Sequence, residues 1–144
     1  MTCKGGSVIK RSFTNSVTLA TDSATGSRPE ADIVSHRVIR SALLAIVDAW
    51  NPVRARASSR PLIQLYRGDS LFPPVWIQYL CPWLAEKITP PSTVLSEHLP
   101  NGGLLMSATK ETFEVDNPAH LKAAQDMAAA MVPLDLLPWP SQRA

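Results

Sequence analysis

Proline is the residue that most restricts what this chain can fold into. Thirteen prolines lie among its 144 residues, nearly twice the usual share of about 5%. Because proline fixes φ and has no backbone N–H, it ends helices and is excluded from central strands. We therefore expect short elements and few long helices. Hydrophobic residues nevertheless make up 45% of the chain, which is enough apolar surface for a buried core.

One helix is predicted to begin at about Asp32 or Ser35 and to end at Trp50, before Asn51 and Pro52. At 100° per residue, its apolar side chains cover one broad face. This face consists of Val34, Val38, Ile39, Ala42, Leu43, Ala45, Ile46, Ala49 and Trp50. Leu44 falls in the opposite, polar arc, where a partner can touch it. We expect Trp50 to press into a sheet.

A second helix is predicted to follow Asn117, because an asparagine cap precedes Pro118 at the first helical position. Pro133 is expected to end this helix. Its predicted apolar stripe consists of Leu121, Ala124, Ala128, Met131 and Val132. The tail that follows is expected to pack through Leu136, Leu137 and Trp139.

Several short apolar or alternating runs are typical of strands. They span residues 16–21, 53–58, 61–66 and 75–80, with a weaker run at 7–13, whereas 21–32 is polar and indicates a loop. Asn101-Gly102 between residues 93–99 and 103–109 predicts a hairpin. The order of elements indicates an α+β fold: an antiparallel sheet of about five strands with two main helices packed on one face. We expect one domain over residues 1–144, with 1–14 and 138–144 peripheral.

Charge is unevenly distributed along the chain. The net charge is +2, but residues 1–67 carry a net +6 and residues 68–144 a net −4. Such asymmetry can steer a partner at long range. No apolar run reaches the length that spans a bilayer, and no secretory signal is visible, so a cytoplasmic protein without a membrane partner is expected. Cys3 and Cys81 alone do not indicate a disulfide framework.

The sequence contains no constellation typical of catalysis. The three histidines, His36, His98 and His120, lack metal-ligand spacing, and no phosphate-binding loop or nucleophile elbow occurs. Asp116 and His120 are four residues apart, which a helix-capping pair explains without catalysis. We therefore expect no cofactor, no metal, no small-molecule substrate and no enzyme activity. An alternative is a small nucleic-acid-binding domain that uses Arg54, Arg56, Arg60 and Arg67.

Five segments of the sequence together resemble the immunity protein 52 family of bacterial polymorphic toxin systems. They are Asn15–Leu19, Ala49–Pro52, Val75–Leu80, Asn101–Leu105 and Phe113–His120. The resemblance covers roughly residues 14–137. Only a short lead precedes the first segment, which suggests a short member of the family or a truncated start.

The resemblance implies a small α+β antitoxin that binds and blocks a nuclease toxin of restriction-endonuclease type. Some such proteins are encoded beside effectors of the type VI secretion system. The expected partner is therefore a cognate toxin, a DNase, with no direct contact to nucleic acid. Because a nuclease needs basic surface to hold DNA, the acids that cluster around the hairpin and the start of the second helix are candidate toxin-binding residues, together with Leu44: Glu97, Glu111, Glu114, Asp116 and Leu44. The remaining motif positions are expected to be structural: Trp50, Trp76, Tyr79, Gly102, Gly103, Phe113, Asn117, Pro118 and His120.

Overall fold

The computed structural model describes residues 2–4, 16–18, 34–66, 68 and 70–137. The chain divides into two units, Glu30–Leu137 and Met1–Pro29 with Pro138–Ala144. In the second of these, β1 (Thr2–Lys4) pairs antiparallel with β2 (Ser16–Thr18). β2 confirms part of the predicted strand 16–21, and β1 was not predicted. The predicted strand 7–13, the loop 21–32 and the packing of Trp139 lie outside the described residues.

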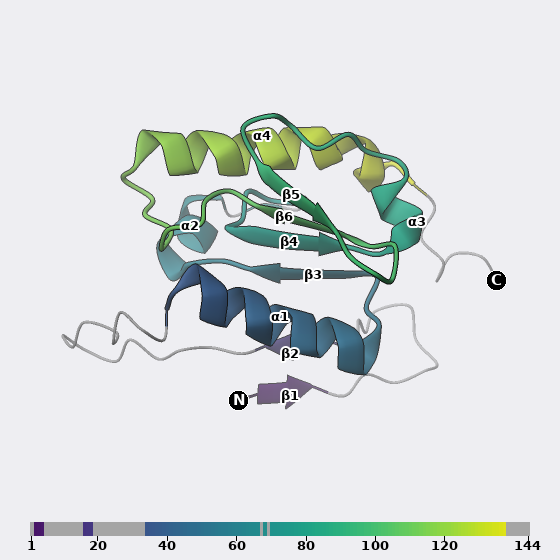
Figure 1. Cartoon of the computed structure of the whole chain (residues 1–144). Coiled ribbons are helices and arrows are strands. Elements are labelled where there is room, and N and C mark those ends of the chain that lie inside the picture. Colours follow the sequence, from purple (N-terminus) through teal and green to yellow (C-terminus); the bar gives the residue numbers. More distant parts are fainter. Residues whose placement is uncertain (1, 5–15, 19–33, 67, 69, 138–144) are drawn as a thin grey trace. The chain divides into compact units, whose positions relative to one another are not determined.

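The unit Glu30–Leu137 is built on a four-stranded antiparallel sheet (Figure 1). Its strands are β3 (Arg54–Ala57), β4 (Ile77–Leu80), β5 (Leu95–His98) and β6 (Leu104–Ser107). They are arranged in the order β3-β4-β6-β5, with β5 and β6 joined as a hairpin. The α+β class and the antiparallel sheet are confirmed, although this sheet has four strands where about five were expected.

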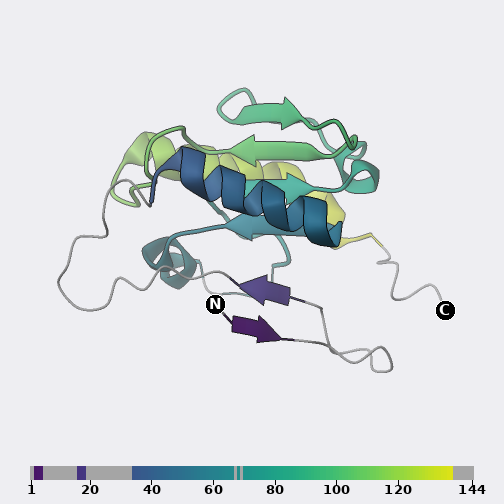
Figure 2. The ribbon, with the colours of Figure 1, turned by 60° about the horizontal axis from the view of Figure 1, so that its bottom comes forward.

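The two long helices, α1 (His36–Trp50) and α4 (Pro118–Asp135), lie on opposite faces of this sheet (Figures 1 and 2). The prediction that both pack on one face is wrong. Every residue of the central strands β4 and β6 is buried. Because successive side chains of a strand point to opposite faces, this burial requires cover on both sides. The apolar run at residues 104–106 of β6 is typical of a strand that is buried on both faces.

The first helix begins and ends where its sequence predicts. Ser35 accepts a capping hydrogen bond from the Val38 N–H, and Asn51 ends the helix in the left-handed conformation at φ 44°. The buried residues are Leu43, which belongs to the predicted arc, and Val47, which does not. Trp50 is 52% exposed, so the prediction that it presses into the sheet is wrong.

The rotation of this helix has a physical cause. His36 and Arg40, which lie on the polar arc in the sequence pattern, both bond to the sheet, at Ser107 and Glu97 respectively. These two bonds turn the polar side of the first turns toward the strands. The far end of the apolar arc, at Ala49 and Trp50, is correspondingly exposed.

The segment predicted as a strand at 61–66 is instead the helix α2 (Arg60–Leu65). Ser59 accepts a hydrogen bond from the Leu62 N–H, and Pro61 lies in the first turn. A serine cap followed by proline is a helix-start signal, and it outweighs the short apolar run. The short helix α3 (Pro82–Ala85) follows β4 and also has a proline in its first turn.

The helix α4 begins at its predicted cap, Asn117, but continues past Pro133 to Asp135. Pro133 is exposed, so water can bond the carbonyl that loses its N–H partner. Among the predicted stripe, Ala124 and Met131 are buried, whereas Val132 and the tail residue Leu136 are exposed. The buried residues of α4 are His120, Ala123, Ala124, Met127, Met131 and Leu134. No helix among the described residues is long and apolar enough to cross a membrane.

The hairpin between β5 and β6 is closed by a three-residue loop. The Gly102 N–H bonds the Leu99 carbonyl, and the Leu99 N–H bonds the Gly103 carbonyl. Gly102 has φ +82°, whereas Asn101 does not have a positive φ. This corresponds to a three-residue hairpin loop with glycine in the left-handed position, rather than a two-residue turn with both residues at positive φ. The Asn101 side chain is used instead to hold the phenol of Tyr79, with Nδ2 3.1 Å from its hydroxyl.

Candidate partner-binding site

Three of the five candidate toxin-binding residues lie in one loop. This acidic loop, residues 109–117, connects β6 to α4 and presents Glu111, Glu114 and Asp116, all of them exposed. Sequence reasoning missed two threonines that brace it. The Thr109 hydroxyl accepts from the Glu111 N–H at 3.1 Å, and the Thr112 hydroxyl donates to the Val34 carbonyl at 3.1 Å. A threonine two residues before the Glu111 amide is the local signal for the first bond.

His120 contacts the acidic loop from its buried side and bonds two of its residues. Its side chain is only 7% exposed. Nδ1 accepts a hydrogen bond from the Glu114 backbone N–H at 3.2 Å, so the ring proton belongs on Nε2, which lies 3.1 Å from a Glu111 carboxylate oxygen. The ring also packs on Phe113, at 5.7 Å between centroids. His120 therefore meets Glu111 and the Glu114 backbone, whereas the sequence suggested Asp116.

Asn117 fixes the place where the loop becomes a helix. Its side-chain oxygen accepts from the N–H groups of Ala119, at 3.0 Å, and of His120, at 3.4 Å. Its own N–H donates to the Glu114 carbonyl at 3.2 Å. Hydrogen bonds therefore hold the loop at both ends, and His120 holds it from the buried side. Its carboxylates are attached to an ordered backbone.

The four candidate carboxylates differ in whether another side chain already bonds them. On β5, Glu97 accepts from Nη2 of Arg40 at 2.6 Å, and Glu111 lies against His120. Within the described part of the chain, Glu114 and Asp116 form no ion pair. An outside cation can therefore bind these two carboxylates without displacing a partner among the described residues. The fifth candidate, Leu44, is half-buried on α1.

A second polar cluster lies between α1 and the sheet, around a pocket of about 260 Å³. His36 Nε2 is 2.9 Å from the Ser107 hydroxyl, and its ring lies 6.2 Å from that of Trp76. Burial lowers the pKa of His36, and the charges of Arg40 and Lys110 lower it further.

A serine bonded to a histidine is one part of a hydrolase triad, so the surroundings of this pair bear on whether it could be catalytic. A triad also needs a carboxylate on the second ring nitrogen and donors for an oxyanion. Among the described residues no carboxylate bonds His36, and the nearby cations disfavour the imidazolium that a general base must become. The pair is better explained as the polar contact that docks the start of α1 on β6.

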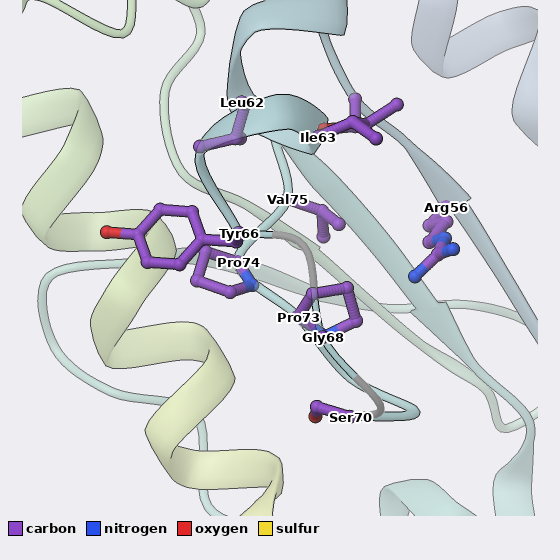
Figure 3. A pocket seen from close by; sticks show the side chains of 10 residues that line it. Arg56, Leu62, Ile63, Tyr66, Gly68, Ser70, Pro73, Pro74 and Val75 are labelled. Atoms are coloured by element: carbon purple, nitrogen blue, oxygen red, sulfur yellow. The ribbon is translucent and has the colours of Figure 1, made fainter.

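The larger pocket, of about 340 Å³, lies between α2 and the segment leading to β4 (Figure 3). Tyr66 lines one side and Arg56 the other, with Ser70 at the end of the lining (Figure 3). The Ser58 hydroxyl is buried there without a hydrogen-bond partner among the described residues. Among the described lining residues, Arg56 and the phenol of Tyr66 are the only ionisable side chains. This composition favours a contact surface over acid–base chemistry.

Of the four arginines of the nucleic-acid alternative, Arg54 contacts other residues of the fold through its guanidinium. The Arg54 guanidinium donates to the Leu71 carbonyl and lies 5.3 Å from the centre of the Phe72 ring. Burial, and then the charge of Arg56, lower the pKa of Arg54. Arg54 is thus a packing residue, whereas Arg56 and Arg60 are exposed. Arg67 lies outside the described residues.

Most of the aromatic motif positions are buried. Trp76 is 3% exposed and donates from Nε1 to the Thr109 carbonyl at 3.2 Å, at the start of the acidic loop. Tyr79 and Phe113 are also buried, whereas Trp50 is the exception already described. No group of three side chains in the described ranges could hold a metal ion.

Comparison with known proteins supplies the family. The family model described as immunity protein 52 matches residues 2–137, and the chain therefore belongs to this family. The search among curated proteins returned no match. An immunity protein has a cognate toxin as its partner.

Proposed function

From its membership of the immunity protein 52 family, we propose that this chain binds one toxin molecule and inhibits it stoichiometrically. The toxin is a nuclease of restriction-endonuclease type, delivered as a type VI secretion effector. Inhibition takes place in the cytoplasm of the bacterium that produces both proteins. The chain itself has no catalytic role in this proposal.

The acidic loop is the observation that supports a nuclease as the partner. A nuclease holds the phosphate backbone with basic side chains around its active site. Glu114 and Asp116 are exposed and form no ion pair within the described residues, and His120 holds the backbone beneath them. Carboxylates on an ordered loop lose little conformational entropy on binding and accelerate association with a basic surface.

The contacts around His36 and His120 support inhibition without turnover. Each imidazole is committed to a structural bond, His36 to Ser107 and His120 to the Glu114 backbone. An inhibitor that acts only by binding must be present in at least equal amount to the toxin.

Co-expression in a heterologous bacterium tests the proposal. The toxin gene adjacent to the gene for this chain should be lethal alone and harmless when this chain is co-expressed. With purified proteins, DNA cleavage should fall linearly with added chain and reach zero near one equivalent. Survival without this chain, or complete inhibition at one part in a hundred, would overturn the proposal.

A further inference from the structure

The strand β5 forms one edge of the four-stranded sheet, and among the described residues nothing pairs with its outer side. All four of its residues, Leu95–His98, are exposed, whereas all four residues of its neighbour β6 are buried. An exposed edge strand presents unpaired N–H and C=O groups to which another chain can add a strand.

The register shows which backbone groups face outward. The Leu99 N–H bonds the Gly103 carbonyl, so positions 99 and 103 form a hydrogen-bonded pair. Such pairs recur at every second residue of an antiparallel ladder. The backbone groups of Glu97 and Leu95 therefore form hydrogen bonds with β6. Their opposite residues there are Leu105 and Ser107 respectively. The N–H and C=O groups of Ser96 and His98 point to the open edge.

The described lining of the pocket beside this edge has a net positive charge. Arg40 is paired with the Glu97 carboxylate, Lys110 contributes the additional positive charge, and the imidazole of His36 is a further polar group. Glu97 faces α1, since it bonds Arg40, and Leu95 shares that face because it is two residues away. Leu95 is 42% exposed, which leaves apolar surface at the same end of the pocket.

We propose that β5 accepts an extended segment of the partner toxin as a fifth strand, bonded to the backbone of Ser96 and His98. The added strand carries an acidic side chain on the α1 face, directed to the cationic pocket. This inference rests on the proposed function for the existence of a toxin partner.

The position of the acidic side chain follows from charge. Residues directly opposite one another in a strand pair share a face, and like charges there are destabilising. A carboxylate opposite Glu97 is therefore disfavoured, whereas one opposite Leu95 lies at the end of the strand where His36 bonds Ser107. The surface also continues into the acidic loop, because Lys110 of the pocket precedes Glu111 directly. The toxin would thus meet carboxylates and cations on adjoining surfaces.

Proline substitution at the edge provides the first test. Ser96→Pro removes only an outward N–H, which an edge strand tolerates, whereas the matched control Ser96→Val keeps that N–H and changes the side chain. Binding of the purified adjacent-gene toxin should weaken about tenfold or more for Ser96→Pro, as expected for a lost backbone pairing. Ser96→Val should bind like wild type. Equal affinity of both variants, each with the wild-type melting temperature, would overturn the proposal.

Hydrogen exchange of the wild-type chain provides a second test that needs no variant to fold. The amides of Ser96 and His98 should exchange rapidly in the free chain and become protected in the toxin complex. A complex that forms and inhibits while these amides still exchange rapidly would overturn the added strand and leave the proposed function intact. Absence of any complex would instead overturn the proposed function. Dimers of the free chain with protected Ser96 and His98 would assign the edge to a second copy and refute the proposal.

Discussion

Gly103 lies so close to the ring of Tyr79 that a Cβ atom at position 103 would be 2.5 Å from Cε2 of the tyrosine and 2.9 Å from its hydroxyl. The glycine therefore lets the hairpin loop close onto a buried aromatic side chain of the central strand β4. Asn101, two residues earlier, bonds the hydroxyl of the same tyrosine and accepts from the Gly103 N–H. This relationship accounts for the Asn-Gly-Gly segment without any role in catalysis.

Gly103→Ala should destabilise the fold more than Gly102→Ala. The first forces the backbone and Tyr79 apart, an overpacking cost of about 1–3 kcal/mol or more. The second places a Cβ in ordinary contact with Pro82, so its cost is mainly the positive φ, about 1 kcal/mol. Urea unfolding of both variants measures the order. Equal loss at the two positions would contradict the close packing of Gly103 on Tyr79.

Trp76→Ala should unfold the protein far more readily than Trp50→Ala. Trp76 is buried, so its truncation should cost about 3–5 kcal/mol, whereas the half-exposed Trp50 should cost about 1 kcal/mol or less. Thermal melting of each variant compares them. If Trp50→Ala melts like wild type but no longer binds the toxin, the residue is an interface anchor. A large drop in its melting temperature would contradict its exposure.

The double variant Glu114→Lys with Asp116→Lys reverses the charge at the two carboxylates that have no ion pair among the described residues. It should slow association with the toxin about tenfold at low salt and make the association rate less dependent on salt. The matched control is Asp48→Lys with Glu86→Lys, which changes the net charge equally at exposed positions outside the acidic loop. Stopped-flow association at several salt concentrations measures the effect. If the control slows association equally, the electrostatic acceleration depends on the net charge of the chain, and the specific role of the acidic loop is contradicted.

His120→Ala should destabilise the acidic loop, because the Glu114 N–H loses its acceptor and Phe113 loses a neighbour. The expected cost is about 1–3 kcal/mol in unfolding free energy. His120→Asn is the conservative control, since its side-chain oxygen can replace Nδ1 as the acceptor. Hydrogen exchange of the Glu114 amide should accelerate for alanine more than for asparagine. Unchanged protection in both variants would contradict the positioning role.

Acid should destabilise the protein partly through His36. Burial, Arg40 and Lys110 lower its folded-state pKa, so the unfolded chain binds a proton more readily. Stability is then complete above the ordinary pKa of about 6.5 and declines as pH falls through it toward the folded value. His36→Gln, which cannot titrate, should lose less stability between about pH 7 and pH 5, as followed by urea unfolding at each pH. An identical pH dependence in the variant would exclude His36 as a source of the loss.

The sequence alone determined where most elements of the main unit begin and end. The Ser35 and Asn117 caps, the strand from Val75 to Leu80 and the hairpin at Asn101-Gly102 all depend on groups a few residues apart. Capping hydrogen bonds and φ preferences act over that distance, so a local pattern records them. The helix α2 also has a local start signal, at Ser59 and Pro61, although the short apolar run within it favours a strand.

The tertiary structure decided which surfaces of these elements are buried and which remain for a partner. His36 bonds a residue 71 positions away, and Arg40 one 57 positions away. These bonds rotate α1 and expose Trp50, which the periodicity had placed in the core. In the acidic loop, too, the tertiary structure decides which carboxylates have a partner. His120 bonds the carboxylate of Glu111 and not that of Glu114 or Asp116, a difference that the spacing of the charges in the sequence does not show. Which side chains are buried depends on partners that are distant in the chain. Hydrophobic periodicity cannot show that a polar side chain will bond such a partner and face the sheet.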